Sequence, residues 1–163
     1  MKVLGIDPGY DRMGLAVIEK NPKQKECLIY SDCLQTSSKD SFYIRLEQVG
    51  SEISKIIEKY EPDILAIESL FITKNQKTAM RVSEARGVIM YEAIKHGIKV
   101  CEYTPLQIKV AVTGYGSSDK THVIKMIPLL VKLPEKKARD DEYDAIAVAL
   151  SCLASEGKSF PQK

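Results

Sequence analysis

The chain lacks several features that would identify particular classes of protein. Its four cysteines form no Cys-x-x-Cys motif and have no histidine nearby at zinc-ligand spacing, which argues against a zinc site. Apolar residues surround Cys33, Cys101 and Cys152, so we interpret these as small core residues in a reducing compartment. No apolar run approaches the roughly 20 residues needed to cross a bilayer, so we expect no membrane contact.

A strong charge of one sign is also missing. The formal net charge is only +2, which neither requires nor excludes a polyanionic partner. Basic residues outnumber acidic ones by seven to three between residues 101 and 139, but a solvated lysine-rich face explains this equally well. Met1 and Lys2 lead directly into an apolar run, so we expect no N-terminal signal sequence and a cytoplasmic protein.

Repeats, linkers and low-complexity stretches are absent from the sequence as well. The chain has 163 residues, of which 44% are hydrophobic and 28% charged, as in an ordinary globular protein. This length is enough to bury a proper core. We therefore expect one domain over residues 1–163, with a frayed tail at 156–163.

The order of the predicted elements indicates an α/β fold. Apolar runs bounded by turn residues predict strands at 2–7, 13–19, 26–36, 63–68 and 98–103. Helical spacing and capping residues predict helices at 41–60, 75–96, 119–132 and 140–155, with a short helix opening at Thr104. Three antiparallel strands followed by alternating helices and strands predict a five-stranded mixed sheet, flanked by helices in three layers.

Two of the predicted strands end on a carboxylate. Asp7 closes the first strand and Glu68 closes the fourth, although buried strands do not normally finish on a charge. If the two strands are parallel neighbours, their carboxyl ends lie ~4.8 Å apart, at the edge of the sheet where ligands bind. Asp7 and Glu68 would then flank one cation.

The last predicted helix brings two further carboxylates. At 100° per residue, Asp141 falls on the apolar stripe of this helix and Asp144 lies about 60° to one side of it. The stripe comprises Ala145, Val148 and Cys152. Both acids should therefore point towards the rim of the sheet.

The acidic residues around this pair receive different predictions. Asp140 lies further round the helix and is interpreted as a helix cap rather than a ligand. Glu142 and Tyr143 are expected to point to solvent.

Each acid taken alone has an ordinary explanation. Asp7 precedes Pro8-Gly9 and suits a turn, Glu68 suits a salt bridge, and Asp141 suits the positive end of a helix dipole. Together they favour a metal site, because carboxylates around one point repel each other without a cation. Oxygen ligands suit Mg²⁺ or Mn²⁺, and two such ions ~3.5–4 Å apart can support displacement at phosphorus.

Several segments together resemble one known family, the RuvC Holliday-junction resolvases. The resemblance runs from about Lys2 to Leu153, and the combination of segments is more specific than any one of them. The segments are Gly5-Ile6-Asp7-Pro8-Gly9, Ala66-Ile67-Glu68, Ala85-Arg86-Gly87, Gly114-Tyr115-Gly116-Ser117-Ser118-Asp119-Lys120 and Asp141-x-x-Asp144-Ala145-Ile146-Ala147.

The resemblance implies a ribonuclease H-like fold and a homodimer with two active sites. These would cut opposite strands of a four-way DNA junction in recombination and repair, leaving 5′-phosphate ends and using two Mg²⁺ per site, with Mn²⁺ as a substitute. It also implies work alongside the RuvA and RuvB branch-migration proteins.

The family pattern further assigns roles to individual residues. Its four catalytic, metal-binding acids fall on Asp7, Glu68, Asp141 and Asp144, the same helix pair that the helical wheel selects. Its two basic residues near the scissile phosphate match Lys109 and Lys120, and Phe71 matches an aromatic that contacts bases at the crossover. Ordinary loop packing is the alternative reading of Phe71.

The chain departs from the family pattern at two places. Ser69 stands where the family often has an amide or an acid, which bears on base preference. Glu142 and Tyr143 replace two small residues between the last acids.

The helix predicted at 75–96 suggests two further interactions. Apolar or small residues cover much of its circumference, which fits burial beneath another helix or a self-complementary dimer interface, and the resemblance favours the dimer. Lys74, Lys77 and Arg81 near its start either grip DNA phosphates or form a solvated helix start. His96 and His122 are isolated and are interpreted as non-catalytic.

Three other functions compete with the resolvase. A RuvX-type fold, linked to ribosomal RNA processing, shares the first Gly-Ile-Asp-x-Gly strand. An actin-like sugar kinase also begins its phosphate loop with Asp-x-Gly, but it needs two such domains. A catalytically silent scaffold that binds junctions would need no metal.

Overall fold

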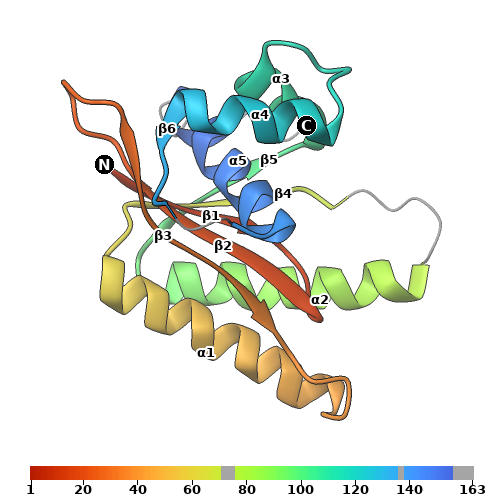
Figure 1. Ribbon diagram of the computed structural model, residues 1–163. Helices are drawn as coiled ribbons and strands as arrows, with labels where there is room; N and C mark the ends of the chain where they lie inside the picture. The colour runs from red at the N-terminus through yellow and green to blue at the C-terminus, as the bar shows by residue number, and fades with distance from the viewer. Residues whose placement is uncertain (71–75, 136–137, 156–163) are drawn as a thin grey trace.

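The computed structural model describes residues 1–70, 76–135 and 138–155 (Figure 1). The strands are β1 (Lys2–Asp7), β2 (Arg12–Glu19), β3 (Glu26–Gln35), β4 (Ile64–Glu68), β5 (Lys99–Tyr103) and β6 (Val131–Lys132). The helices are α1 (Phe42–Tyr60), α2 (Gln76–Lys95), α3 (Pro105–Thr113), α4 (Lys120–Leu130) and α5 (Asp140–Ala154).

The strands form one mixed sheet in the order β5-β4-β1-β2-β3-β6. β1 is antiparallel to β2 and parallel to β4, and β4 is parallel to β5. The register pairs Ile6 with Ile67, so the next residues, Asp7 and Glu68, end neighbouring strands at the same level. The expected parallel pairing of these two strands is confirmed.

The sheet has six strands in place of the five expected. The helix predicted to run to residue 132 ends at Leu130, two residues after Pro128, whose ring nitrogen donates no hydrogen bond. Val131 and Lys132 then pair in parallel with the start of β3. A two-residue strand has no periodicity of its own, which is why the sequence did not predict it.

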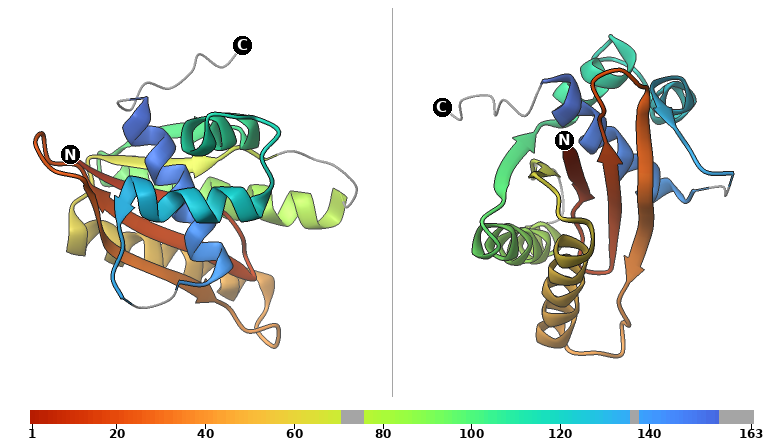
Figure 2. Two further views of the ribbon diagram at one scale, coloured as in Figure 1. Left: turned by 45° about the horizontal axis from the view of Figure 1, so that its top comes forward. Right: turned by 90° about the vertical axis from the view of Figure 1, so that its left-hand side faces the viewer.

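Helices cover both faces of the sheet, as Figure 2 shows from the side. Side chains alternate across β1, so that Leu4 and Ile6 pack with α1 and α2 on one face, while Val3 packs with α3, α4 and α5 on the other. The expected three-layer arrangement is confirmed.

Helix α5 lies unusually close to the sheet, directly over β1 and β2 (Figure 2). A Cβ added at Gly5 would lie 2.3 Å from the Ala145 carbonyl oxygen and 2.7 Å from Ala149 Cβ. A Cβ at Gly14 would lie 2.0 Å from the Asp141 carbonyl oxygen. Real Cβ atoms do not approach so closely, so glycine at both positions permits this packing.

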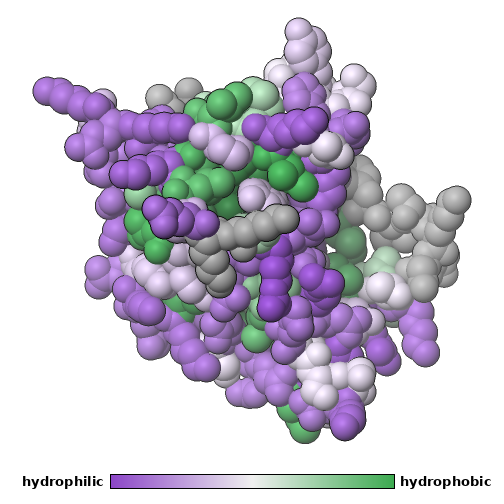
Figure 3. Space-filling view, in the orientation of Figure 1, coloured by the Kyte–Doolittle hydropathy of each residue, from purple (hydrophilic) through white to green (hydrophobic). Residues whose placement is uncertain are grey.

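The surface seen in Figure 3 is mainly hydrophilic, with apolar atoms gathered towards the helices at the top of the view. The exposed apolar side chains on these helices include Leu106 and Val110 of α3 and Leu129 of α4. Within the described ranges, no helix has both the length and the apolar character needed to span a membrane.

Candidate active site

Four carboxylates from three elements meet at the carboxyl end of β1. Asp7 and Glu68 end adjacent strands, and the first turns of α5 carry Asp141 and Asp144. Gly14 is paired with Asp7 across the hairpin and touches the Asp141 backbone, so this glycine lies between the two acids. The sequence predicted this location for all four, and their role as metal ligands stays a prediction.

The negative charges of the three other acids all act on Asp7, which marks it as the centre of the group. Burial and the negative charges of Asp144, Glu68 and Asp141 raise the pKa of Asp7 to about 7. Burial and Asp144 also raise the pKa of Glu68, while Arg86 and Lys120 partly oppose that change. Both shifts therefore reflect burial first and the negative charge of neighbouring acids second.

A cavity of about 260 Å³ opens beside the acids. Its polar lining comprises Glu68, Asp144, Lys109 and Lys120, which come from four different elements or their ends. The cavity is therefore lined both by acidic groups that can hold a cation and by basic groups that can bind a phosphate.

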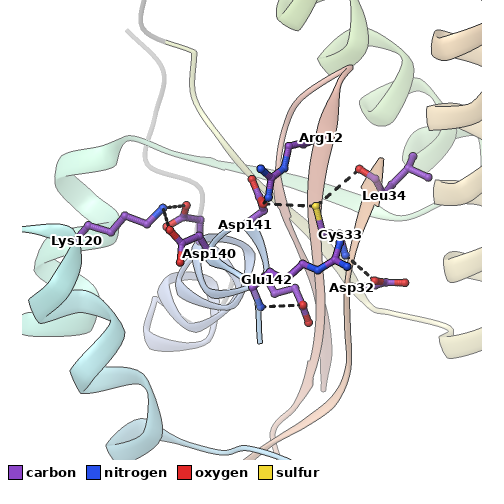
Figure 4. Close-up of polar contacts among 10 residues, drawn as sticks. Arg12, Asp32, Cys33, Leu34, Lys120, Asp140, Asp141 and Glu142 are labelled. Atoms are coloured by element: carbon purple, nitrogen blue, oxygen red, sulfur yellow. Dashed lines mark hydrogen bonds and ion pairs between the residues drawn. The ribbon is translucent and has the colours of Figure 1, made fainter. Parts of the chain in front are cut away.

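Basic side chains hold two of the acids in ion pairs (Figure 4). Lys120 Nζ donates to Asp144 Oδ2 at 2.7 Å and lies 3.8 Å from Asp140 Oδ2. Burial alone would lower the pKa of Lys120, but the hydrogen bond and charge of Asp144 raise it on balance. On the other side of α5, Arg12 Nη2 donates to Asp141 Oδ2.

Over residues 1–70, 76–135 and 138–155, no three acidic, histidine or cysteine side chains are gathered into a ready-made metal cage. Asp141 and Asp144 are instead paired with Arg12 and Lys120. The chemistry of the four acids nevertheless fits a hard divalent cation, since all supply oxygen and the charge crowded around Asp7 is what a cation would relieve.

Glu142 and Asp140 differ from their predictions. Glu142 is buried, accepts a hydrogen bond from Ser31 Oγ at 2.6 Å and caps the Arg139 backbone N–H at 3.0 Å, so it does not point to solvent. Arg139 is the N-cap residue, and Asp140 is the first residue of the helix. The helical wheel could not reveal either partner of Glu142.

Tyr143 also differs from its prediction. It is partly buried and packs against the core cluster on the α5 face of the sheet, instead of pointing to solvent. A buried carboxylate and a packed ring thus occupy the two positions where the family pattern has small residues.

Of the predicted DNA-contacting residues, Lys109 and Lys120 line the cavity, and Lys77 and Arg81 lie on α2. Lys77 is exposed at the start of α2. The Arg81 guanidinium lies 5.0 Å from the Phe42 ring centroid and 5.8 Å from that of Tyr10. Phe71 and Lys74 lie outside the described residues.

Some residues near the acids were missed by the sequence reasoning. Arg12 and Cys33 both contact Asp141, and the Cys33 thiol lies 3.5 Å from Asp141 Oδ2. The register of the β1–β2 hairpin, which places Gly14 opposite Asp7, is the signal that could have located Arg12. Arg86 is buried on α2 and pairs with Glu102 of β5, and its charge partly opposes the rise in the pKa of Glu68.

Comparison with known proteins decides the family. The family model described as crossover junction endodeoxyribonuclease RuvC matches residues 3–152. The chain belongs to the RuvC family. RuvC proteins of Caldicellulosiruptor saccharolyticus and Finegoldia magna are 43% and 45% identical to it, covering 100% and 92% of this chain and 98% and 91% of theirs.

Solved structures agree with the family assignment. Thermus thermophilus RuvC in complex with Holliday junction substrate superposes with a TM-score of 0.86 at 26% identity, covering 96% of this chain and 95% of that one. The yeast mitochondrial resolvase Ydc2 shares the fold, with a TM-score of 0.71 at 13% identity over 93% of this chain and 77% of its own. The expected ribonuclease H-like fold is confirmed.

We expect Asp7 to make the cation-free protein less stable as pH rises. Because the pKa of Asp7 is raised from 3.8 to about 7, the folded protein keeps a proton that the unfolded chain releases across this interval. Replacing Asp7 with Asn should therefore stabilise the protein by an amount that grows from pH 3.8 to about 7 and then levels off.

Thermal unfolding of wild type and Asp7→Asn in EDTA, over a series of pH values, measures this difference. Repeating the series with Mg²⁺ should shrink it, because a bound cation stabilises the chain that retains all four carboxylates more than the variant that has three. A difference independent of pH would mean that neither burial nor the neighbouring acids raise the pKa of Asp7 in the folded protein.

Proposed function

We propose that this chain resolves Holliday junctions by hydrolysing phosphodiester bonds in opposite strands of a four-way DNA junction. The observation that carries the proposal is the meeting of Asp7, Glu68, Asp141 and Asp144 beside a cavity that also contains Lys109 and Lys120. Family membership supplies the substrate class, since the relatives are named crossover junction endodeoxyribonucleases.

The four acids would hold two Mg²⁺ ions per active site, with Mn²⁺ as a substitute. When bound, such ions lower the pKa of water and offset charge at the phosphate. The chain itself binds and orients the strand through the cavity between α3, α4 and α5. The products would be 5′-phosphate and 3′-hydroxyl ends.

Lys120 has the most direct part among the basic groups. Its pairing with Asp144 places the ammonium group at the mouth of the acid cluster, where it would offset the negative charge that develops on the phosphate. Lys109 lines the same cavity and would hold the strand in place. Lys77 and Arg81 would bind phosphates further along the DNA, and Phe71 and Lys74 keep their predicted DNA contacts.

A homodimer would supply the two active sites needed for paired cuts. Helix α2 packs against α1, yet it leaves Met80, Tyr91 and Ile94 at 66%, 65% and 63% exposure. At 100° per residue these three fall on one stripe with Gly87, beside which the protomer has open space. A second copy of the same stripe would cover it. We also place the reaction in the cytoplasm, alongside RuvA and RuvB.

Cleavage of a synthetic four-way junction tests the function. We expect strand cuts that need Mg²⁺ or Mn²⁺ and leave 5′-phosphate ends, with a linear duplex of the same sequence left intact. Asp7→Asn should abolish cutting while junction binding stays equal or improves, because removing a charge from the acid cluster reduces its repulsion of DNA.

The same assay separates the competing functions. Loss of binding together with cleavage in folded Asp7→Asn would contradict the assignment of the acids. Cleavage of single-stranded RNA in preference to the junction would favour the RuvX-type function. Junction binding without metal-dependent cutting by the wild type would leave only the scaffold.

The dimer has a separate test. Tyr91→Asp or Ile94→Asp places a charge in the proposed interface, so we expect sedimentation to show a monomer where the wild type is a dimer. Leu129→Asp is the matched control, because Leu129 is 68% exposed on α4, away from α2. A dimer that survives both α2 changes, or dissociates equally with the control, would contradict the α2 interface.

A further inference from the structure

Arg12 contacts an active-site acid but has no part in the proposed reaction. It is the first residue of β2, and its guanidinium Nη2 donates to Asp141 Oδ2 of α5 (Figure 4). The Arg12 side chain is 53% exposed, whereas that of Asp141 is 21% exposed. The ion pair therefore lies at the solvent-exposed edge of the acid cluster. The Arg12 side chain can move away from Asp141 there while the protein stays folded.

The backbone beside this ion pair is fixed. The Asp141 carbonyl oxygen rests on Gly14, where an added Cβ would meet it at 2.0 Å. The following residue, Glu142, is buried and bonded to Ser31. Because the main chain cannot shift, the Asp141 carboxylate can change partners only by rotating its own side chain.

The partner of Asp141 also differs from that of Asp144. Lys120 reaches Asp144 from the cavity, on the side where a phosphate would bind, and already belongs to the proposed catalytic group. Arg12 reaches Asp141 from the opposite side of α5, beside the Cys33 thiol. Both Arg12 and Cys33 donate to the same oxygen, Oδ2, so a cation that claims this oxygen must displace them.

We propose that Arg12 is a positioning residue that neutralises Asp141 in the cation-free enzyme and releases it when a divalent cation binds. The inference rests on the proposed use of Asp141 as a cation ligand. Exposed ion pairs are weak and screened by water, so a doubly charged ion inside the acid cluster competes with Arg12 successfully. Arg12 thus limits the repulsion among the acids before a cation binds, and it sets the cation concentration needed to fill the site.

Binding of Mn²⁺ to the DNA-free protein tests this directly, with free Mn²⁺ measured by electron paramagnetic resonance. Arg12→Gln keeps a side chain that donates hydrogen bonds but removes the charge, so it should bind Mn²⁺ roughly two- to fivefold more tightly than wild type. Lys55→Gln is the matched control, because Lys55 carries the same charge at 72% exposure on α1. Its affinity should equal that of the wild type.

A double-variant comparison isolates the pair. In an Asp141→Asn background, Arg12→Gln should no longer tighten Mn²⁺ binding, since the carboxylate for which Arg12 competes is gone. Circular dichroism and thermal unfolding verify that each variant is folded before its affinity is measured. Arg12→Lys, which keeps the positive charge, serves as a second variant, and we expect its Mn²⁺ affinity to be close to that of the wild type.

The outcomes separate this inference from the proposed function. If wild type binds Mn²⁺ and folded Arg12→Gln binds it equally well, Arg12 does not compete with the ion and the proposal is wrong. If folded Arg12→Gln binds it more weakly, Arg12 anchors Asp141 for the ion and the proposal is also wrong. If Arg12→Gln still tightens Mn²⁺ binding in the Asp141→Asn background, the effect of Arg12 on affinity does not depend on its ion pair with Asp141. The proposal is then wrong as well. If neither wild type nor Arg12→Gln binds Mn²⁺, the cation site of the proposed function fails and the inference fails with it.

Discussion

The contact between α5 and the sheet is the constraint on which the active-site region depends. Two residues without side chains, Gly5 and Gly14, let the helix backbone rest directly on β1 and β2. A methyl group at either position would meet a carbonyl oxygen of the helix within 2.3 Å or less, and the helix would have to move away. Because Asp141 and Asp144 are carried by the first turns of this helix, such a movement would separate them from Asp7.

Electrostatics then follows from that packing. Burial of Asp7 at the end of β1, together with the negative charges of Asp144, Glu68 and Asp141, raises the pKa of Asp7 to about 7. Arg12 and Lys120 each pair with one of the helix acids, while among the described residues no ion pair joins Asp7 or Glu68. Within the described part of the chain, the site therefore has two acids without an ion pair, Asp7 and Glu68, and two basic residues at its edge that can change partners. This arrangement is suited to binding divalent cations.

Local pattern was sufficient for much of the site. Asp7 and Glu68 could be placed because a charge at the end of an apolar strand is unusual and because parallel neighbours end together. Asp141 and Asp144 could be placed because helical periodicity specifies which positions share the face that packs on the sheet. The three layers could be predicted as well, because the order of strands and helices also follows from the spacing of apolar residues along the chain.

The features that the sequence did not predict depend on contacts between segments that are far apart in the chain. The spacing of residues along the chain does not reveal such contacts. Glu142 is buried because Ser31 of β3 and the Arg139 backbone satisfy its oxygens, and neither partner follows from the helix alone. Arg12 reaches Asp141 through the register of a hairpin. The sixth strand exists because two residues after α4 meet the start of β3. Phe71 and Lys74 stay predictions outside the described residues.

A crystal of the protein soaked in Mn²⁺, with data collected at the manganese absorption edge, tests the central claim most directly. The anomalous difference map should show manganese bounded by Asp7, Glu68, Asp141 and Asp144, with Arg12 turned away from Asp141. Manganese bound elsewhere on the molecule, with these four carboxylates unchanged, would contradict the claim that the packing of α5 on the sheet builds a divalent cation site.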